Sequence, residues 1–369
     1  MTHQLKTRYS LLRGCSLFEF AAGDRAQPHY LIGSYSNVVA VTSAHQRTAL
    51  TQLARGEDPL ETVSESVREN LRGFISTLMQ RGLLNDRAQE LRTPARNLDE
   101  ISASDIAINQ LRARSAPELL QSEWIDSVGD GGTSTLVARA QHLVELSGRS
   151  RVITLLYSIL LASGVTQIRF SDPHFKPVVS DLDIGFGALS MSDFGAHYYE
   201  THLRRQRQLS LFPIDRAVTA DSHCATPIIA IHSGDCDPVQ LLEWSNTKIP
   251  HLVIHPPVGD EVVVGPTVIP GETPCNRCLS LYEIDNFGFT TSNRIELTAV
   301  DELPTATAHY VAAIVASQIL NFIDYLNSDK SKEIIRNTGI GEITYINFQR
   351  LNEPQVVAIA RHPLCGCDA

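Results

Sequence analysis

Two close pairs of cysteines constrain the fold of this chain more than any other feature. Cys275 and Cys278 are separated by two residues in PGETPCNRCLSL, and Cys365 and Cys367 by one residue in RHPLCGCDA. A CxxC pair alone fits either a redox dithiol or half of a metal site, but redox chemistry leaves the second pair unexplained. Four thiolates complete a tetrahedron around Zn²⁺ and leave no open coordination position. We therefore expect a structural zinc site that holds the last residues on the domain body, with a redox dithiol or four ordinary thiols as alternatives.

The other three cysteines do not extend this site. Cys15, Cys224 and Cys236 have no partner at ligand spacing, so each is expected to be a buried small apolar residue. His223 and Cys224 are adjacent, and adjacent residues of a strand face opposite ways, so they do not form a catalytic dyad. The total of seven cysteines is odd, which argues against a disulfide framework.

From about residue 136 the chain alternates between predicted strands and helices. Strand 140–148, helix 152–164 and strand 165–172 form a βαβ unit, which implies parallel strands. Further strands are expected at 227–235, 251–256, 341–348 and 355–360, and helices at 193–208, 238–246 and 305–327. The segment 261–271 is typical of a hairpin or an extended pair. The pattern predicts an α/β domain over 136–369 with a Rossmann-like, mostly parallel sheet.

Residues 1–88 follow a different pattern, that of a winged-helix-like α+β module. Short apolar runs at 16–20, 29–33 and 37–42 indicate strands separated by turns. Three helices follow: one capped by Ser43 and ended by Gly56, one opening at Pro59, and one with an apolar face around 68–82. The polar stretch 89–135, which ends in DSVGDGGTS, reads as a linker.

Composition and charge exclude several classes of partner. The 369 residues are 43% hydrophobic and carry a formal net charge of -10, so a general affinity for nucleic acid is not expected. Spanning a bilayer takes roughly 18–20 apolar residues, and the longest apolar run, 152–165, is shorter and contains serine and glycine. The first residues lack the features of a signal peptide. We expect a cytoplasmic protein with no membrane partner.

The turn after the first strand of the α/β domain is where a nucleotide phosphate would bind. That chemistry needs several glycines, so that backbone N–H groups can approach phosphate. Here only Gly148 is present, followed by Arg149, Ser150 and Arg151. Asp172, at the end of the second strand, is in place for a ribose hydroxyl. One glycine and one aspartate favour a sheet kept as scaffold over a working nucleotide site, although Arg149 and Arg151 could hold an anion.

The C-terminal motifs resemble a known family. GPTVIPGETPCNRCLSLYEID with HPLCGC is similar to the ThiF/MoeB/HesA class of ubiquitin-activating-enzyme-like proteins, which have an ATP-binding α/β domain and a four-cysteine zinc site. It resembles more closely the cyclodehydratase-type members associated with YcaO proteins, which bind leader peptides in azole-forming RiPP biosynthesis. The resemblance covers about 136–369, and the N-terminal module fits the family's peptide-recognition winged helix by pattern.

The chain departs from the active adenylating pattern of that class. The GxGGxG loop is reduced to SGRSRV, the arginine-bearing stretch that binds triphosphate corresponds to SDLDIGFGAL, and an expected lysine is replaced by His197. Nearly every group that would neutralise a triphosphate is missing, and charge stabilisation dominates this chemistry. We therefore expect no independent catalytic activity and no ATP, with Zn²⁺ as a structural cofactor.

The resemblance implies a binding role for the N-terminal module. In such relatives a leader peptide adds a strand to the edge of the small sheet, with its side chains beside the third helix. The corresponding residues here are Val39, Val41, Leu71, Phe74 and Leu78, which are otherwise simply core residues. The resemblance thus implies a leader-peptide-binding subunit for a YcaO-type enzyme, and a homodimer. The alternatives are an ATP-dependent adenylyltransferase acting on a peptide or carrier-protein carboxylate, and a scaffold with a regulatory partner.

Overall fold

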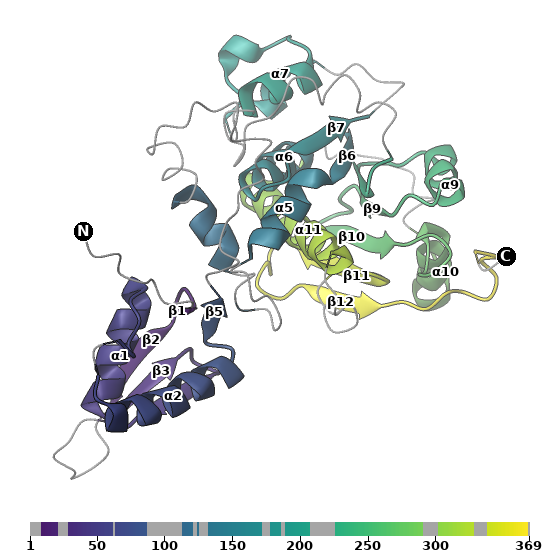
Figure 1. Ribbon diagram of the computed structural model, residues 1–369. Helices are drawn as coiled ribbons and strands as arrows, with labels where there is room; N and C mark the ends of the chain where they lie inside the picture. Colours follow the sequence, from purple (N-terminus) through teal and green to yellow (C-terminus); the bar gives the residue numbers. More distant parts are fainter. Residues whose placement is uncertain are drawn as a thin grey trace. The chain divides into compact units, whose positions relative to one another are not determined.

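A computed structural model gives two compact units, Met1–Val137 and Ala138–Ala369 (Figure 1). It describes residues 9–20, 29–61, 63–86, 113–120, 124, 132–171, 178–185, 189–206, 226–290, 302–327 and 338–367. Most of the expected linker 89–135 lies outside these residues, so its bounds stay a prediction. Asp172, His223 and Cys224 also lie outside them.

The N-terminal unit contains two small antiparallel sheets and two long helices. The larger sheet has the order β2-β3-β4, and β1 pairs with β5 in the smaller one. The elements are β1 (Tyr9–Leu11), β2 (Ser16–Phe20), β3 (His29–Gly33), β4 (Val38–Val41), α1 (Ala44–Arg55), α2 (Glu65–Gln80) and β5 (Leu84–Asp86). Gly33 is required at the β3–β4 turn, because a Cβ there would lie 2.0 Å from the carbonyl oxygen of Asn37.

Local chemistry sets the bounds of the helices in this unit. The Ser43 hydroxyl accepts from the backbone N–H of Gln46 at the start of α1, and Gly56 ends that helix with a φ of 75°, as the sequence predicts. The prediction of a helix that begins at Pro59 is wrong. The Asp58 carboxylate instead accepts from the N–H of Leu60 at 2.9 Å and folds the chain into a turn, so that the next helix is α2.

The C-terminal unit is built on a seven-stranded sheet with the order β12-β11-β10-β9-β8-β6-β7. Its strands are β6 (Leu143–Gly148), β7 (Gln167–Phe170), β8 (Ile229–Ser233), β9 (His251–Ile254), β10 (Glu261–Val268), β11 (Glu342–Asn347) and β12 (Gln355–Ala358). Strands β6 to β9 pair in parallel, and β10, β11 and β12 add antiparallel, so five of the seven strands point the same way. The predicted mostly parallel α/β domain is confirmed. The segment expected as a hairpin or extended pair at 261–271 contains the single strand β10.

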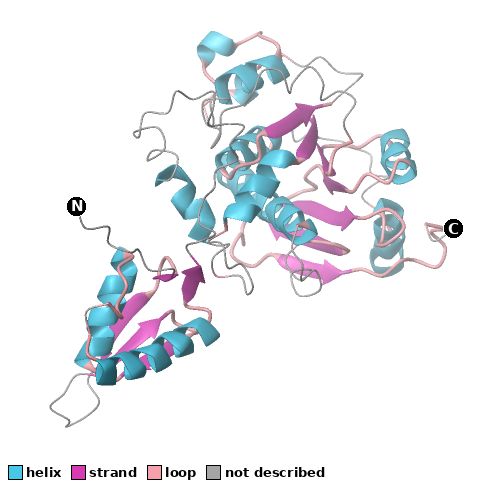
Figure 2. Cartoon of the chain, in the orientation of Figure 1, coloured by secondary structure: helices cyan, strands magenta, loops and turns pink. Residues whose placement is uncertain are grey.

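Helices cover both faces of this sheet (Figure 2). The helices described here are α5 (Thr133–Gln141), α6 (Arg151–Ala162), α7 (Tyr198–Gln206), α9 (Pro238–Asn246), α10 (Asn276–Phe287) and α11 (Thr305–Leu326), of which α6 and α11 cover one face and α10 the other. Along β10, Val262 and Val264 pack in one core with α6 and α11, whereas Val263 packs in another with Leu279 of α10. Successive residues of a strand face opposite sides, so β10 contributes to both cores.

Helix α11 is long, with 22 residues, and mostly apolar. By length and composition it could cross a membrane, so the expectation from the sequence that no segment is long and apolar enough to span a bilayer is wrong for this helix. Residues along it, including Val311, Val315 and Ile319, are fully buried against the sheet and α6. Core helices of soluble proteins have the same length and composition, so α11 alone is only weak evidence for a membrane span.

Candidate functional sites

The four cysteines of the two close pairs come together in the C-terminal unit. Their sulfur atoms all lie within 4.8 Å of one another. The Sγ of Cys275 is 3.9 Å from that of Cys278 and 3.3 Å from that of Cys365, and the Sγ atoms of Cys278 and Cys367 are 3.5 Å apart. These separations are far longer than the ~2.05 Å of a disulfide. The cluster could hold a metal ion, and its donor set is compatible with zinc.

The sequence positions explain how the cluster forms. Cys275 is the N-cap residue of α10 and Cys278 lies in its first turn, so one helix start presents both sulfurs. Burial opposes ionisation of Cys278, but hydrogen bonds, led by that from the backbone N–H of His362, outweigh it and lower its pKa. Burial raises the pKa of Cys365, and raises that of Cys367 to about 11. Burial thus favours the protonated thiol at Cys365 and Cys367.

The remaining described cysteines are less buried than expected. Cys15 packs against the edge of the N-terminal core and Cys236 follows β8, and both are half-buried rather than buried.

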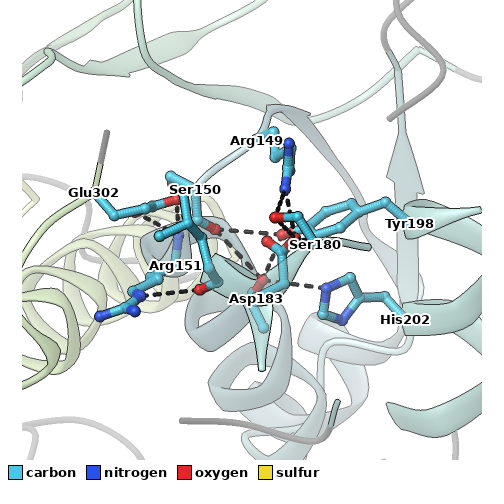
Figure 3. Close-up of polar contacts among 10 residues, drawn as sticks. Arg149, Ser150, Arg151, Ser180, Asp183, Tyr198, His202 and Glu302 are labelled. Atoms are coloured by element: carbon cyan, nitrogen blue, oxygen red, sulfur yellow. Dashed lines mark hydrogen bonds and ion pairs between the residues drawn. The ribbon is translucent and has the colours of Figure 1, made fainter. Parts of the chain in front are cut away.

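A second group of polar side chains lies where β6 ends and α6 begins (Figure 3). Gly148 ends β6 with a φ of 80°, and a Cβ there would lie 2.1 Å from the carbonyl oxygen of Ser233 on β8. The close approach of β8 is thus sufficient reason for this glycine. Ser150 caps α6 by accepting from the N–H of Ile153 at 3.2 Å.

The two arginines of this turn are held by groups of the protein itself. The Arg149 guanidinium donates to the Asp183 carboxylate at 2.5 Å and to the hydroxyl of Ser180. The Arg151 guanidinium donates to the carbonyl oxygen of Leu182 at 3.1 Å. Asp183 and Ser180 belong to the short 3-10 helix Asp181–Asp183 and its cap. Arg149 therefore holds an internal carboxylate, whereas the Arg151 guanidinium bonds to a neutral backbone carbonyl.

The N-terminus of α6 is occupied by a second internal carboxylate. Both oxygens of Glu302 lie 3.1 Å from the backbone nitrogen of Arg151, so its N–H is shared between them. Burial raises the pKa of Glu302, and the Arg151 backbone and side chain offset part of that rise. A carboxylate at this position interacts favourably with the positive end of the helix dipole. Of the first three N–H groups of α6, Glu302 and Ser150 take two.

Behind this turn lies a buried group of hydroxyls and a histidine. The hydroxyls of Thr154 and Tyr198 are hydrogen-bonded, and Nε2 of His202 lies 3.1 Å from the Thr154 hydroxyl. Burial raises the pKa of Tyr198 and lowers that of His202 to about 4, so the imidazole is neutral near pH 7. Nδ1 of His202 and Oδ1 of Asp183 are buried without a hydrogen-bond partner among the described residues.

The sequence indicated only part of this polar cluster. It gave Gly148, Arg149 and Arg151, which the structure brings together, and Asp172, which lies outside the described residues. It missed Glu302, Tyr198 and His202, which reach the turn from distant segments. The pair Ser180 and Asp183 had a readable signal, because S-x-x-D is a capping-box spacing and both reciprocal hydrogen bonds are present.

ATP is the group that the ThiF-like class implies for this turn, and two of the described groups that would meet its phosphates are already bonded within the chain. A triphosphate needs free N–H groups at the helix start and unpaired cations. Here Glu302 accepts from Arg151 N–H, and Arg149 is paired with Asp183.

A third candidate site is a groove in the N-terminal unit beside the open edge of β4. This groove has a volume of about 480 Å³ and is lined by Val38, Val39, Ala40, Gln46, Asn70, Phe74, Thr77 and Arg81. Among the strands that the structure describes, β4 pairs with β3 only, so its other side is an edge of that sheet. Of the expected peptide-binding residues, Val39 and Phe74 line the groove. Val41, Leu71 and Leu78 are buried and do not belong to that lining.

Comparison with known proteins identifies the fold. No family model and no curated protein sequence matches this chain. Solved structures do match: the microcin C7 biosynthetic enzyme MccB in complex with N-formylated MccA (TM-score 0.62, 16% identity), E. coli MccB with ATP (0.60, 16%) and PaaA (0.61, 16%). The matches to MccB cover 98% of this chain and 99% of that chain, and the match to PaaA covers 94% and 99%.

These likenesses place the chain in a structural class: it has the ThiF-like fold, as its C-terminal motifs indicated. At 15–16% identity they show the fold and no more. One MccB structure contains ATP, so the comparisons give no support to the expectation that this chain lacks ATP.

Proposed function

We propose that this chain binds an extended peptide at the edge of β4 and presents it to a separate modifying enzyme of the YcaO type. The peptide groove beside that edge is the observation that carries the proposal. Solved structures of the same fold include complexes of MccB with MccA, which supports a peptide as the ligand.

The backbone of β4 is suited to strand addition. The N–H of Ser34 donates to the carbonyl of Asn37 at 2.9 Å, which makes this a hydrogen-bonded pair. Pairs alternate along an antiparallel ladder, so Val39 and Val41 bond to β3, and Val38 and Ala40 direct their N–H and C=O groups to the open edge. A peptide strand placed there would satisfy these groups, with alternate side chains directed to α2.

The role is proposed to be non-catalytic. The first N–H of α6 and the Arg149 guanidinium are the groups that would contact a phosphate. Glu302 accepts from the former and Asp183 pairs with the latter, which supports a chain that does not use ATP. The second candidate is an ATP-dependent adenylyltransferase acting on a peptide carboxylate, which the MccB complex with ATP favours. Calorimetry with Mg-ATP separates the two: micromolar affinity would favour the adenylyltransferase.

The remaining features of the proposal follow from the same resemblance. Zn²⁺ bound by Cys275, Cys278, Cys365 and Cys367 would be structural, since four protein ligands leave no open position. A cytoplasmic homodimer is proposed as well. Size-exclusion chromatography with light scattering tests the dimer.

The peptide-binding proposal is tested by selecting random 12-residue peptides on the full-length protein. Ala40→Pro removes an N–H that faces the open edge, at an exposed position where an edge strand tolerates proline. Peptides enriched on the parent protein should be lost on this variant, provided that both show the same circular dichroism and unfolding midpoint. Equal enrichment on both, or none on either, would refute peptide binding at this edge.

A further inference from the structure

The peptide groove combines an apolar floor with one charged side chain, and this combination indicates which peptides it would select. Val39 and Phe74 are buried beneath the groove and form an apolar floor. Gln46 and Asn70 are also part of the lining, but they bond to each other at 3.4 Å, and Gln46 accepts from the N–H of Thr42 at 2.7 Å. Thr77 donates to the carbonyl of Gly73. The polar groups of the lining are thus largely satisfied within the unit.

Arg81 differs from the rest of the lining. It is the one charged residue among the described residues that line the groove, and no described carboxylate forms an ion pair with it. Its side chain is exposed at the end of α2, and its carbonyl accepts from the side-chain amide of Asn37 at 2.7 Å. That contact fixes Arg81 beside the β3–β4 turn, at the Val38 end of the edge.

From this arrangement we infer that the groove selects peptides in which an acidic residue and an apolar residue are two positions apart. This inference rests on the proposed peptide-binding function. Side chains at i and i+2 of a strand share one face, and two residues span roughly 6.6 Å. With the apolar side chain over Val39 and Phe74, the side chain two positions nearer the turn reaches Arg81.

The order of the two residues depends on the direction of the added strand. In a peptide that runs antiparallel to β4, the acidic residue follows the apolar residue in the peptide sequence. In a peptide that runs parallel to β4, the acidic residue precedes it. Both orders use the same contacts, since the carboxylate meets the guanidinium in each case. A bidentate arginine–carboxylate pair adds directional selectivity to the backbone pairing, which by itself is indifferent to sequence.

The experiment uses the peptides enriched on the full-length protein and lost on Ala40→Pro. The expected result is an excess of Asp or Glu two positions from Val, Ile, Leu or Phe over the unselected library. A representative peptide and its Glu→Gln counterpart are then titrated by fluorescence anisotropy. The acidic peptide should bind about 1.5- to fivefold more tightly, the range of an exposed ion pair.

Arg81→Gln supplies the matched test, because the backbone contacts of residue 81 remain. It should remove the preference for the acidic peptide and leave the affinity for the Gln counterpart unchanged. Arg72→Gln, an exposed arginine of α2 outside the lining, should keep the preference. If enriched peptides bind at the edge with no acidic excess, or if Arg81→Gln keeps the preference, this inference is overturned while the proposed function stands. If no peptide depends on the edge, both are overturned.

Discussion

Replacing Glu302 by alanine should open the N-terminus of α6 to an external anion. Both carboxylate oxygens lie 3.1 Å from the backbone nitrogen of Arg151, so a phosphate oxygen cannot accept from this N–H while the carboxylate is in place. Two unit negative charges about 4 Å apart repel by about 4 kcal/mol at an effective dielectric constant of ~20. That repulsion corresponds to roughly a thousandfold weaker binding of a singly charged anion.

The same substitution removes a helix cap. Loss of a side-chain acceptor at a helix N-terminus costs about 0.5–2 kcal/mol. Burial raises the pKa of Glu302, which means that desolvation of the carboxylate offsets part of the stability that the cap contributes. We therefore expect Glu302→Ala to lower the free energy of unfolding by about 1 kcal/mol. Glu302→Gln keeps an amide oxygen as acceptor but removes the charge, so its stability should lie between those of Glu302→Ala and the parent protein.

Urea unfolding with and without inorganic phosphate measures both effects. Glu302→Ala should be less stable without phosphate and recover with it, by about 2.7 kcal/mol when phosphate reaches a hundred times its Kd. The parent protein, and the exposed control Glu353→Ala, should show no comparable gain. If phosphate stabilises the parent protein as much as Glu302→Ala, Glu302 does not block this position.

Three further predictions concern stability and metal content. Plasma emission spectrometry should find one zinc per chain, lost when Cys365 and Cys367 are both replaced by serine; a metal-free, fully folded parent protein would contradict the site. Asp324→Ala removes the carboxylate that accepts from Arg139, whose side chain is 1% exposed, and urea unfolding should show a loss of about 3–5 kcal/mol. His202 has a pKa lowered to about 4 by burial, so the unfolded chain takes up the proton first and stability falls as pH drops below about 6.5. Between pH 7.5 and 5, His202 should lower the free energy of unfolding by about 2 kcal/mol, and the His202→Gln variant should lack this part of the decrease. Equal pH dependence of the two proteins would contradict this prediction.

The features predicted well from the sequence are those whose cause is local. The two cysteine pairs were readable because metal ligands recur at short spacings, and the structure brings all four sulfurs together. The bounds of α1 followed from a capping serine and a terminal glycine. The expected helix at Pro59 failed for an equally local reason, since Asp58 bonds to the N–H of Leu60 and forms a turn instead.

The polar cluster at α6 could not be assembled from the sequence. Glu302 precedes α11 and Asp183 lies in a short loop helix, and only the order of the strands brings both to the turn after β6. No periodicity or spacing marks a residue whose partner lies more than a hundred positions away, as Glu302 does from Arg151. Such contacts depend on the tertiary fold rather than on local propensity.

The presence of Gly148 does not by itself indicate a nucleotide-binding site. From the sequence, a single glycine after the first strand is only a weak signal for a phosphate-binding turn, and a sheet kept as scaffold is favoured. In the structure a Cβ at this position would lie 2.1 Å from a backbone oxygen of β8, so sheet packing alone requires glycine, with or without a phosphate. The residue that discriminates is Glu302, because its carboxylate and a phosphate compete for the same N–H group. A chain that kept Gly148 and lacked Glu302 would be the better candidate for binding ATP at this turn.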